Sequence, residues 1–86
     1  MPSNQAILNN VKVSDWVRSG ETMRFRIVIE TQHSNMWATH LERQDRNNAD
    51  SSWTESAKYY GHYDMTREEA EIDYAQRLKE LKRDNR

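Results

Sequence analysis

Hydrophobic and polar residues alternate most clearly between Met23 and Gln32. The apolar residues at every second position of this run are Met23, Phe25, Ile27 and Ile29. The residues between them are Arg24, Arg26, Val28 and Glu30. Because successive side chains of a strand point to opposite faces, this period predicts a β-strand with one core face and one largely solvated face.

A second alternating run follows the polar segment His33-Ser34-Asn35. One side of this run carries Trp37, Thr39 and Leu41, and the other carries Met36, Ala38, His40 and Glu42. Two alternating runs joined by a short polar connection are typical of a β-hairpin. We therefore expect the two runs to pair.

Shorter stretches flank this hairpin. Upstream, Val11, Val13 and Val17 alternate with polar residues, and Ser19-Gly20 supplies turn residues before the next strand. A first strand is expected here, although Ser14 to Arg18 could instead form a helical turn.

Downstream, residues 45–52 contain no apolar periodicity and are predicted to form the main mobile loop. The segment from Trp53 to Tyr63 then alternates again and predicts a last strand. Its two faces would carry Ala57, Tyr59 and Tyr63 on one side and Lys58, Tyr60 and His62 on the other.

The C-terminal segment predicts a helix over residues 66–84. Thr66 and Glu69 have the spacing of a capping box, in which each side chain bonds the backbone N–H of the other residue. Acidic residues gather at the start of this segment and basic residues at its end, as the helix dipole favours. An apolar stripe at helical spacing consists of Ala70, Tyr74, Leu78 and Leu81. We expect this stripe to lie on the sheet.

These elements predict an α+β fold, an antiparallel β-meander of three to four strands packed against one C-terminal α-helix. Eighty-six residues suffice for one two-layered domain but not for a second core, so residues 1–86 are expected to form a single domain. The sheet would cover about residues 6–63. Only 35% of the residues are hydrophobic, so the core must rely on large side chains. These are Trp16, Trp37, Trp53, Phe25 and the four tyrosines.

Composition narrows the classes of function. Thirteen basic residues stand against fourteen acidic ones, a net charge of -1 that has neither the excess typical of a nucleic-acid binder nor the acidity of a DNA mimic. The chain has no cysteine, which excludes disulfides and thiolate metal sites and favours a cytoplasmic location. No apolar run approaches the roughly 20 residues that cross a bilayer, so no membrane contact is expected.

Candidate chemistry for catalysis is sparse. His33, His40 and His62 form no HxH or HxxxH pair that would favour a metal site. The serines lack an activating Gly-x-Ser-x-Gly turn, and Gly20 and Gly61 are the only glycines, too few for a phosphate-binding loop. We therefore predict a protein that is not an enzyme, with no catalytic residue, metal or cofactor. An enzyme that uses His40 or His62 ranks last among our hypotheses.

The sheet face opposite the helix is the best candidate for a contact surface. The residues predicted to bind a partner there are Arg24, Arg26, His40, Tyr60 and His62, with Trp53 beside the mobile loop. Arginine and tyrosine are enriched at protein interfaces, which favours a protein partner. A small RNA-binding or single-stranded DNA-binding protein is the alternative, weakened by Glu30 and Glu42 on the same face. An uncovered sheet face also needs polar residues for solvation alone.

A second contact could involve the helix flank. Ile72, with Ala75, lies away from the predicted apolar stripe. Together they could form a homodimer patch, although single exposed apolar residues are common and usually carry no function.

Residues 60–70 read Tyr-Gly-His-Tyr-Asp-Met-Thr-Arg-Glu-Glu-Ala and are followed by Asp73-Tyr74. This segment resembles that of many small proteins of bacteriophages and other mobile elements, in which a last strand enters a helix through a Thr-x-Glu-Glu-Ala start. The resemblance implies a protein that acts in the bacterial host cytoplasm. It also implies a host protein or complex as its partner, such as one of restriction or CRISPR-Cas immunity, in the manner of an anti-CRISPR inhibitor. It implies no catalytic residue.

Overall fold

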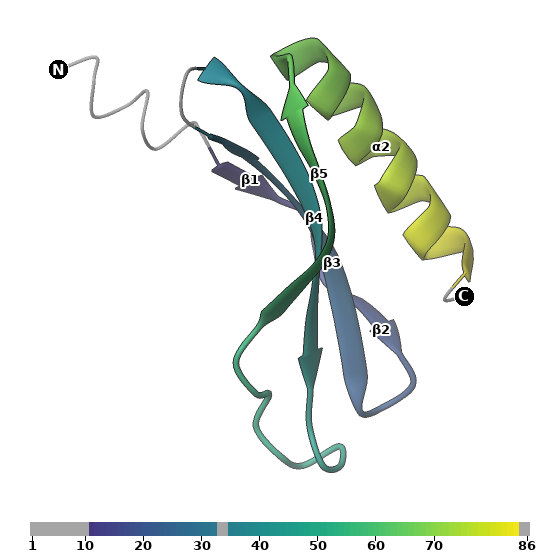
Figure 1. The fold of residues 1–86 in the computed structure, drawn as a ribbon. Helices are drawn as coiled ribbons and strands as arrows, with labels where there is room; N and C mark the ends of the chain where they lie inside the picture. Colours follow the sequence, from purple (N-terminus) through teal and green to yellow (C-terminus); the bar gives the residue numbers. More distant parts are fainter. Residues whose placement is uncertain (1–10, 33–34, 85–86) are drawn as a thin grey trace, which may run out of the picture.

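The computed structural model describes residues 11–32 and 35–84, which form an antiparallel sheet and one long helix (Figure 1). The elements are β1 (Val11–Val13), β2 (Val17–Ser19), β3 (Met23–Thr31), β4 (Trp37–Asp45), β5 (Ala57–Met65) and α2 (Arg67–Asp84). The sheet order is β1-β3-β4-β5, and β2 also pairs with β3. The predicted α+β class is confirmed, with five strands.

The central hairpin pairs β3 with β4 without a break. Its register runs from Met23 opposite Asp45 to Thr31 opposite Trp37. The strand β4 continues to Asp45, so the segment predicted as the loop 45–52 begins in a strand. The connection between β4 and β5 covers residues 46–56. Residues 6–10 of the predicted sheet, and His33 in its predicted turn, lie outside the described residues.

The predicted first strand is split into β1 and β2 at Ser14. Its backbone N–H donates to the Ile27 carbonyl at 3.0 Å, and its hydroxyl accepts from the Ile27 N–H at 2.9 Å. Val13 pairs with Val28 whereas Val17 pairs with Phe25, so three residues bulge opposite two. Because of the extra residue, the side chains after the bulge point to the opposite face of the sheet from the one that strict alternation would give. The alternative of a helical turn over Ser14 to Arg18 is wrong, because β2 begins at Val17.

The helix α2 covers one face of the sheet (Figure 1). The predicted capping box is present: the Glu69 N–H donates to the Thr66 hydroxyl at 3.1 Å, and the Thr66 N–H donates to the Glu69 carboxylate at 2.9 Å. The core beneath the helix consists of Ile29, Trp37 and Ala70, with Met65 and Tyr74 packed against it. Ile72 points away from the core, with 67% of its surface exposed.

The expected contribution of the large aromatic residues to the core is mostly wrong. Of these residues only Trp37 is buried, and much of the remaining core is aliphatic, with Ile27 and Ile29 each 1% exposed. Tyr59, Tyr60 and Tyr63 are exposed. Trp16 and Trp53 are half-buried away from the helix. Among the described residues, no helix covers the sheet face opposite α2, and we call this face the open face. Trp16 and Trp53 lie on it, which makes it the candidate contact surface.

Candidate binding surface

Six cationic and aromatic side chains gather on the open face, at the end of the sheet that carries β2. They are Trp16, Arg18, Arg24, Arg26, Arg46 and Trp53, and we call them the arginine–tryptophan ladder. In Figure 1 this end of the sheet, with β2 and the β4–β5 connection, extends past the C-terminal end of the helix.

Arg24 lies at the centre of the ladder. Its Cζ atom is 4.3 Å from the centroid of the Trp16 ring and 4.4 Å from that of Trp53. Arg26 lies 4.3 Å from Trp16, and Arg46 lies 4.1 Å from Trp53. These distances fall within the range of cation–π attraction, about 6 Å. Each indole therefore contacts at least two guanidinium groups.

The sheet register brings the arginines together. Arg24 lies opposite Arg18 of β2 on one side and opposite Gln44 of β4 on the other. Arg26 is two residues along β3 and therefore faces the same side. Directly opposed residues share a face of the sheet, so Arg18 joins the two arginines of β3. Arg18 is 5.8 Å from the Trp53 ring.

The β4–β5 connection positions Trp53. The Thr54 N–H donates to the Asp45 carbonyl at 2.8 Å, and the Asp45 N–H donates to the Thr54 hydroxyl at 3.1 Å. Next to them, the Arg46 N–H donates to the Thr22 carbonyl at 2.9 Å. These bonds anchor both ends of the segment 46–53 to strand ends. Trp53 is thereby held over the open face although it lies outside any strand.

The ladder is rich in positive charge. Arg26 donates to the Glu42 carboxylate, whereas Arg24 donates from Nε at 2.8 Å and from Nη2 at 2.5 Å to the amide oxygen of Gln44. Burial lowers the pKa of Arg24, and the positive charges of Arg18, Arg26 and Arg46 lower it further. An arginine stays protonated in proteins at neutral pH, so the charges of the ladder persist.

The opposite end of the open face is centred on His40. Its Nε2 is 3.2 Å from the Tyr63 hydroxyl, and its Nδ1 is 3.5 Å from Glu30, which also pairs with Lys58 at 3.4 Å. The Tyr63 ring lies over Gly61, where an added Cβ would clash with the tyrosine ring and hydroxyl. Burial is the main cause that lowers the pKa of His40, against the opposing charge of Glu30.

The predicted placement of His62 and Tyr60 on the open face is wrong. β5 contains two register shifts against β4, and Tyr60 at the first of them has a φ of 52°. The extra residue turns His62 to the helix side, where its Nδ1 lies 2.9 Å from Asp73 of α2. Tyr63, predicted on the helix side, reaches the open face instead and contacts His40.

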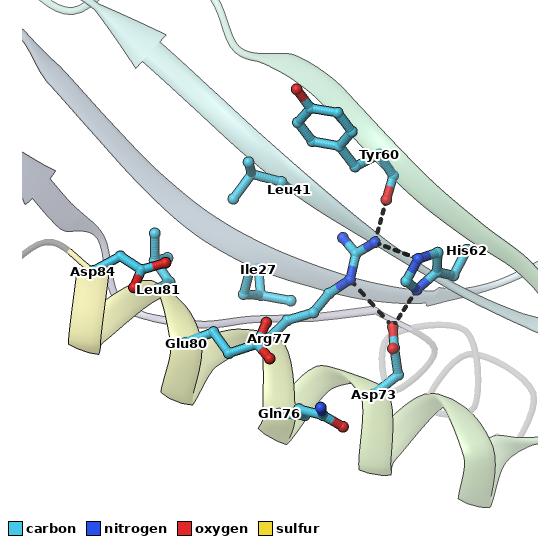
Figure 2. A pocket seen from close by; sticks show the side chains of 10 residues that line it. All are labelled: Ile27, Leu41, Tyr60, His62, Asp73, Gln76, Arg77, Glu80, Leu81 and Asp84. Carbon is cyan, nitrogen blue, oxygen red and sulfur yellow. Dashed lines mark hydrogen bonds and ion pairs between the residues drawn. The ribbon is translucent and has the colours of Figure 1, made fainter.

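His62 belongs to a polar cluster between β5 and α2 (Figure 2). The Asp73 carboxylate also accepts from the Thr39 hydroxyl at 2.5 Å and pairs with Arg77 at 3.3 Å. Arg77 in turn donates to the Tyr60 carbonyl and lies 2.9 Å from His62 Nε2. Burial raises the pKa of Asp73, but hydrogen bonds from Thr39 and His62 and the charges of His62 and Arg77 outweigh it, so the pKa is lowered.

This cluster borders a cavity of about 390 Å³ between the sheet and the C-terminal half of the helix (Figure 2). The residues that line it are Ile27, Leu41, Tyr60, His62, Asp73, Gln76, Arg77, Glu80, Leu81 and Asp84. Its lining combines apolar side chains with acidic and basic side chains. The polar groups of His62, Asp73 and Arg77 are already bonded to one another or to the backbone, so the cluster ties the helix to the edge strand.

The structure thus brings together Arg24, Arg26 and Trp53 of the predicted contact residues. His40 shares the open face but lies apart from the ladder, and Tyr60 and His62 lie on the helix side. Sequence reasoning missed Trp16, Arg18 and Arg46. Pairing β2 with β3 across the Ser19-Gly20 turn would have placed Arg18 opposite Arg24, but nothing in the pattern indicates the bulge that places Trp16.

Three further observations bear on function. Among residues 11–32 and 35–84, no three histidine or acidic side chains come close enough to hold a metal ion. In the same part of the chain, no helix is long and apolar enough to cross a membrane. No family model, curated protein or solved structure matches this chain.

Proposed function

We propose that this protein is a non-enzymatic binding module that contacts a partner protein through the arginine–tryptophan ladder. The observation that carries the proposal is the packing of two indoles among four guanidinium groups on a sheet face that no described helix covers. Tryptophan and arginine are the residue types that dominate the binding energy of protein interfaces. Their mutual contacts order them before binding, which lowers the entropy lost on association.

A purely structural role explains the ladder less well. An uncovered face needs only polar residues of mixed charge, and long arginine stems would shield the strands beneath it. The ladder instead concentrates four like charges, of which only Arg26 has a carboxylate partner among the described residues, and they repel one another in the free protein. Such a concentration is easier to explain by a partner that offsets it than by the stability of the free chain.

The resemblance of residues 60–70 to phage and mobile-element proteins supports a bacterial target. On that ground we propose a host protein of defence or regulation as the partner, of the kind that anti-CRISPR inhibitors block. A small compact domain with a single contact face suits inhibition by occupation of the target's own binding site.

Single-stranded nucleic acid is the competing partner. Proteins of that type stack bases on exposed aromatic rings beside basic groups. Here the guanidinium groups of Arg24 and Arg46 already lie 4.3 Å and 4.1 Å from the rings of Trp16 and Trp53, so a base would compete with them for these rings.

The test is an affinity pull-down of the tagged protein from bacterial lysate, with and without nuclease. We expect one stoichiometric, nuclease-resistant protein that is lost with the double variant Arg24→Ala/Trp53→Ala. The matched control is Arg67→Ala/Tyr60→Ala, which removes the same kinds of group away from the ladder and should retain the partner. Circular dichroism verifies that both variants fold. Recovery of nuclease-sensitive material alone, or equal retention by both variants, would refute the proposal.

A further inference from the structure

The ladder carries an unbalanced charge that indicates the chemistry of its partner. Resting on the proposed function, we propose that the partner segment is acidic and that its carboxylates bind the guanidinium groups of Arg18, Arg24 and Arg46. Three observations lead to this inference: a pair of neighbouring cross-strand contacts, the distribution of acidic residues around the ladder, and the free N–H groups of the stacked arginines.

Two successive cross-strand pairs on the open face differ in one respect. Arg26 lies opposite Glu42 and donates to its carboxylate, while Arg24 lies opposite Gln44 and donates to its amide. Glutamate and glutamine have nearly the same shape and reach. The chain therefore neutralises the first arginine and leaves the second, which is central to the ladder, hydrogen-bonded but still uncompensated in charge.

Acidic residues are abundant in the chain, and those that form ion pairs do so mostly away from the ladder. Within the described residues, Glu42 is the only carboxylate that pairs with any of the four ladder arginines. Arg43, on the helix side of β4, pairs with Asp45 at 2.8 Å, and Arg67 pairs with Glu71 at 3.0 Å. Among the described residues, three of the four ladder arginines thus lack a matching anion. Like charges held together destabilise the free state, and an anionic partner relieves that repulsion.

The stacked geometry leaves N–H groups available. A guanidinium group has five N–H donors in a rigid plane, and this plane matches a carboxylate through two parallel hydrogen bonds. Arg24 uses its Nε and Nη2 groups on Gln44, and Arg46 uses its Nε on the Glu21 carbonyl at 2.6 Å. Among the described residues, none accepts a hydrogen bond from the Arg18 guanidinium group, which lies 5.8 Å from the Trp53 ring. Contact with the face of an indole ring leaves the N–H edges of a guanidinium group unoccupied.

A carboxylate suits this surface better than a nucleotide. Nucleic acids gain affinity from bases that stack on open aromatic faces, and arginines already contact both indoles of the ladder. Carboxylates need only the guanidinium edges. An acidic protein segment therefore binds without rearranging the ladder.

The experiment gives the ladder a carboxylate of its own. In Gln44→Glu, the new carboxylate can still accept from Arg24. The Ser56 hydroxyl, which accepts from the Gln44 amide at 2.9 Å, can rotate to donate to that carboxylate, so the fold should persist. The probe is a fluorescent polyglutamate peptide of about ten residues, with binding read as anisotropy at roughly 50 mM salt. We expect the variant to bind the probe roughly tenfold more weakly than the unmodified protein. Gln76→Glu, an exposed helix position with the same change in charge, is the control and should bind normally.

Four results would overturn the inference. One is equal binding of the peptide by the protein and by Gln44→Glu, and another is no binding of the peptide at all. The third is tighter binding of a single-stranded oligothymidylate of similar charge, which would make phosphate the ligand. A protein partner that survives nuclease in the pull-down, yet remains bound to Gln44→Glu at unchanged strength, would refute the acidic chemistry while leaving the proposed function standing.

Discussion

Arg77 of α2 donates a hydrogen bond to the backbone carbonyl of Tyr60 in β5, the residue at which the edge strand bulges with a φ of 52°. An aromatic residue rarely adopts this left-handed conformation, which costs about 1–2 kcal/mol. The same arginine contacts Asp73 and His62. One side chain therefore links the bulge, the histidine that the bulge redirects, and the helix.

Replacing this arginine should loosen the helix from the edge strand. In Arg77→Ala, the Tyr60 carbonyl and the half-buried Asp73 each lose a partner, which should lower the free energy of unfolding by about 2–3 kcal/mol. Urea denaturation followed by circular dichroism measures this change. Arg67→Ala removes an exposed helical ion pair and a contact 5.4 Å from the centre of the Trp37 ring, and should cost only about 1 kcal/mol or less. Equal losses in the two variants would contradict a special role for Arg77.

The strained backbone at Tyr60 predicts a stabilising substitution. Tyr60→Gly removes the left-handed penalty and leaves the carbonyl bonded to Arg77, while the lost ring is 77% exposed. We expect the free energy of unfolding to rise by about 0.5–1 kcal/mol, after allowance for the greater freedom of glycine in the unfolded chain. Tyr59→Gly, at a neighbouring position with no positive φ, should destabilise the protein instead. Denaturation curves that rank the two variants in the opposite order would disprove the strain argument.

The buried His40 makes stability depend on pH. Its folded pKa lies below the ordinary value of 6.5, so the unfolded chain takes up the proton first as the pH falls. Stability from this residue is therefore complete above pH 6.5 and decreases as the pH falls towards the lowered folded pKa.

We expect the melting temperature to fall between about pH 7 and pH 5, and to fall less in His40→Gln, which does not titrate in this range. The measurement compares the slope of melting temperature against pH in the unmodified protein with that in His40→Gln. The difference between the two slopes cancels the titration of other groups. Parallel slopes would show that His40 does not contribute to this dependence.

Ser14 should matter more than a surface serine. Its hydroxyl accepts the buried Ile27 N–H, and Ser14→Ala leaves that donor without its partner. A buried, unsatisfied N–H costs about 1–3 kcal/mol, so the denaturation midpoint should drop accordingly. Ser56→Ala, which removes an exposed contact to Gln44, is the control and should change little. If hydrogen exchange at Ile27 remained as slow in Ser14→Ala as in the parent protein, the bond would have no protective role.

Local patterns in the chain predicted the parts of the fold that depend on neighbours in sequence. The alternation over Met23 to Gln32 and the run after Asn35 gave the β3–β4 hairpin, because period-two burial is a property of any paired strand. The Thr66–Glu69 capping box gave the start of α2 to within one residue, because both of its bonds form within one helical turn. For the candidate surface, the same alternation placed Arg24 and Arg26 on the open face.

Only the tertiary structure decided the rest. The bulges at Ser14 and Tyr60 exchange the faces of the residues that follow, and their hydrogen-bond partners, Ile27 and Arg77, lie more than ten residues away along the chain. No local period contains such a contact. The register of β2 against β3 and the anchored connection from β4 likewise bring Trp16, Arg46 and Trp53 to Arg24. The sequence by itself determined which segments form strands and the helix, whereas long-range pairing determined which side chains meet, since a shift of one residue in a strand reverses every face beyond it.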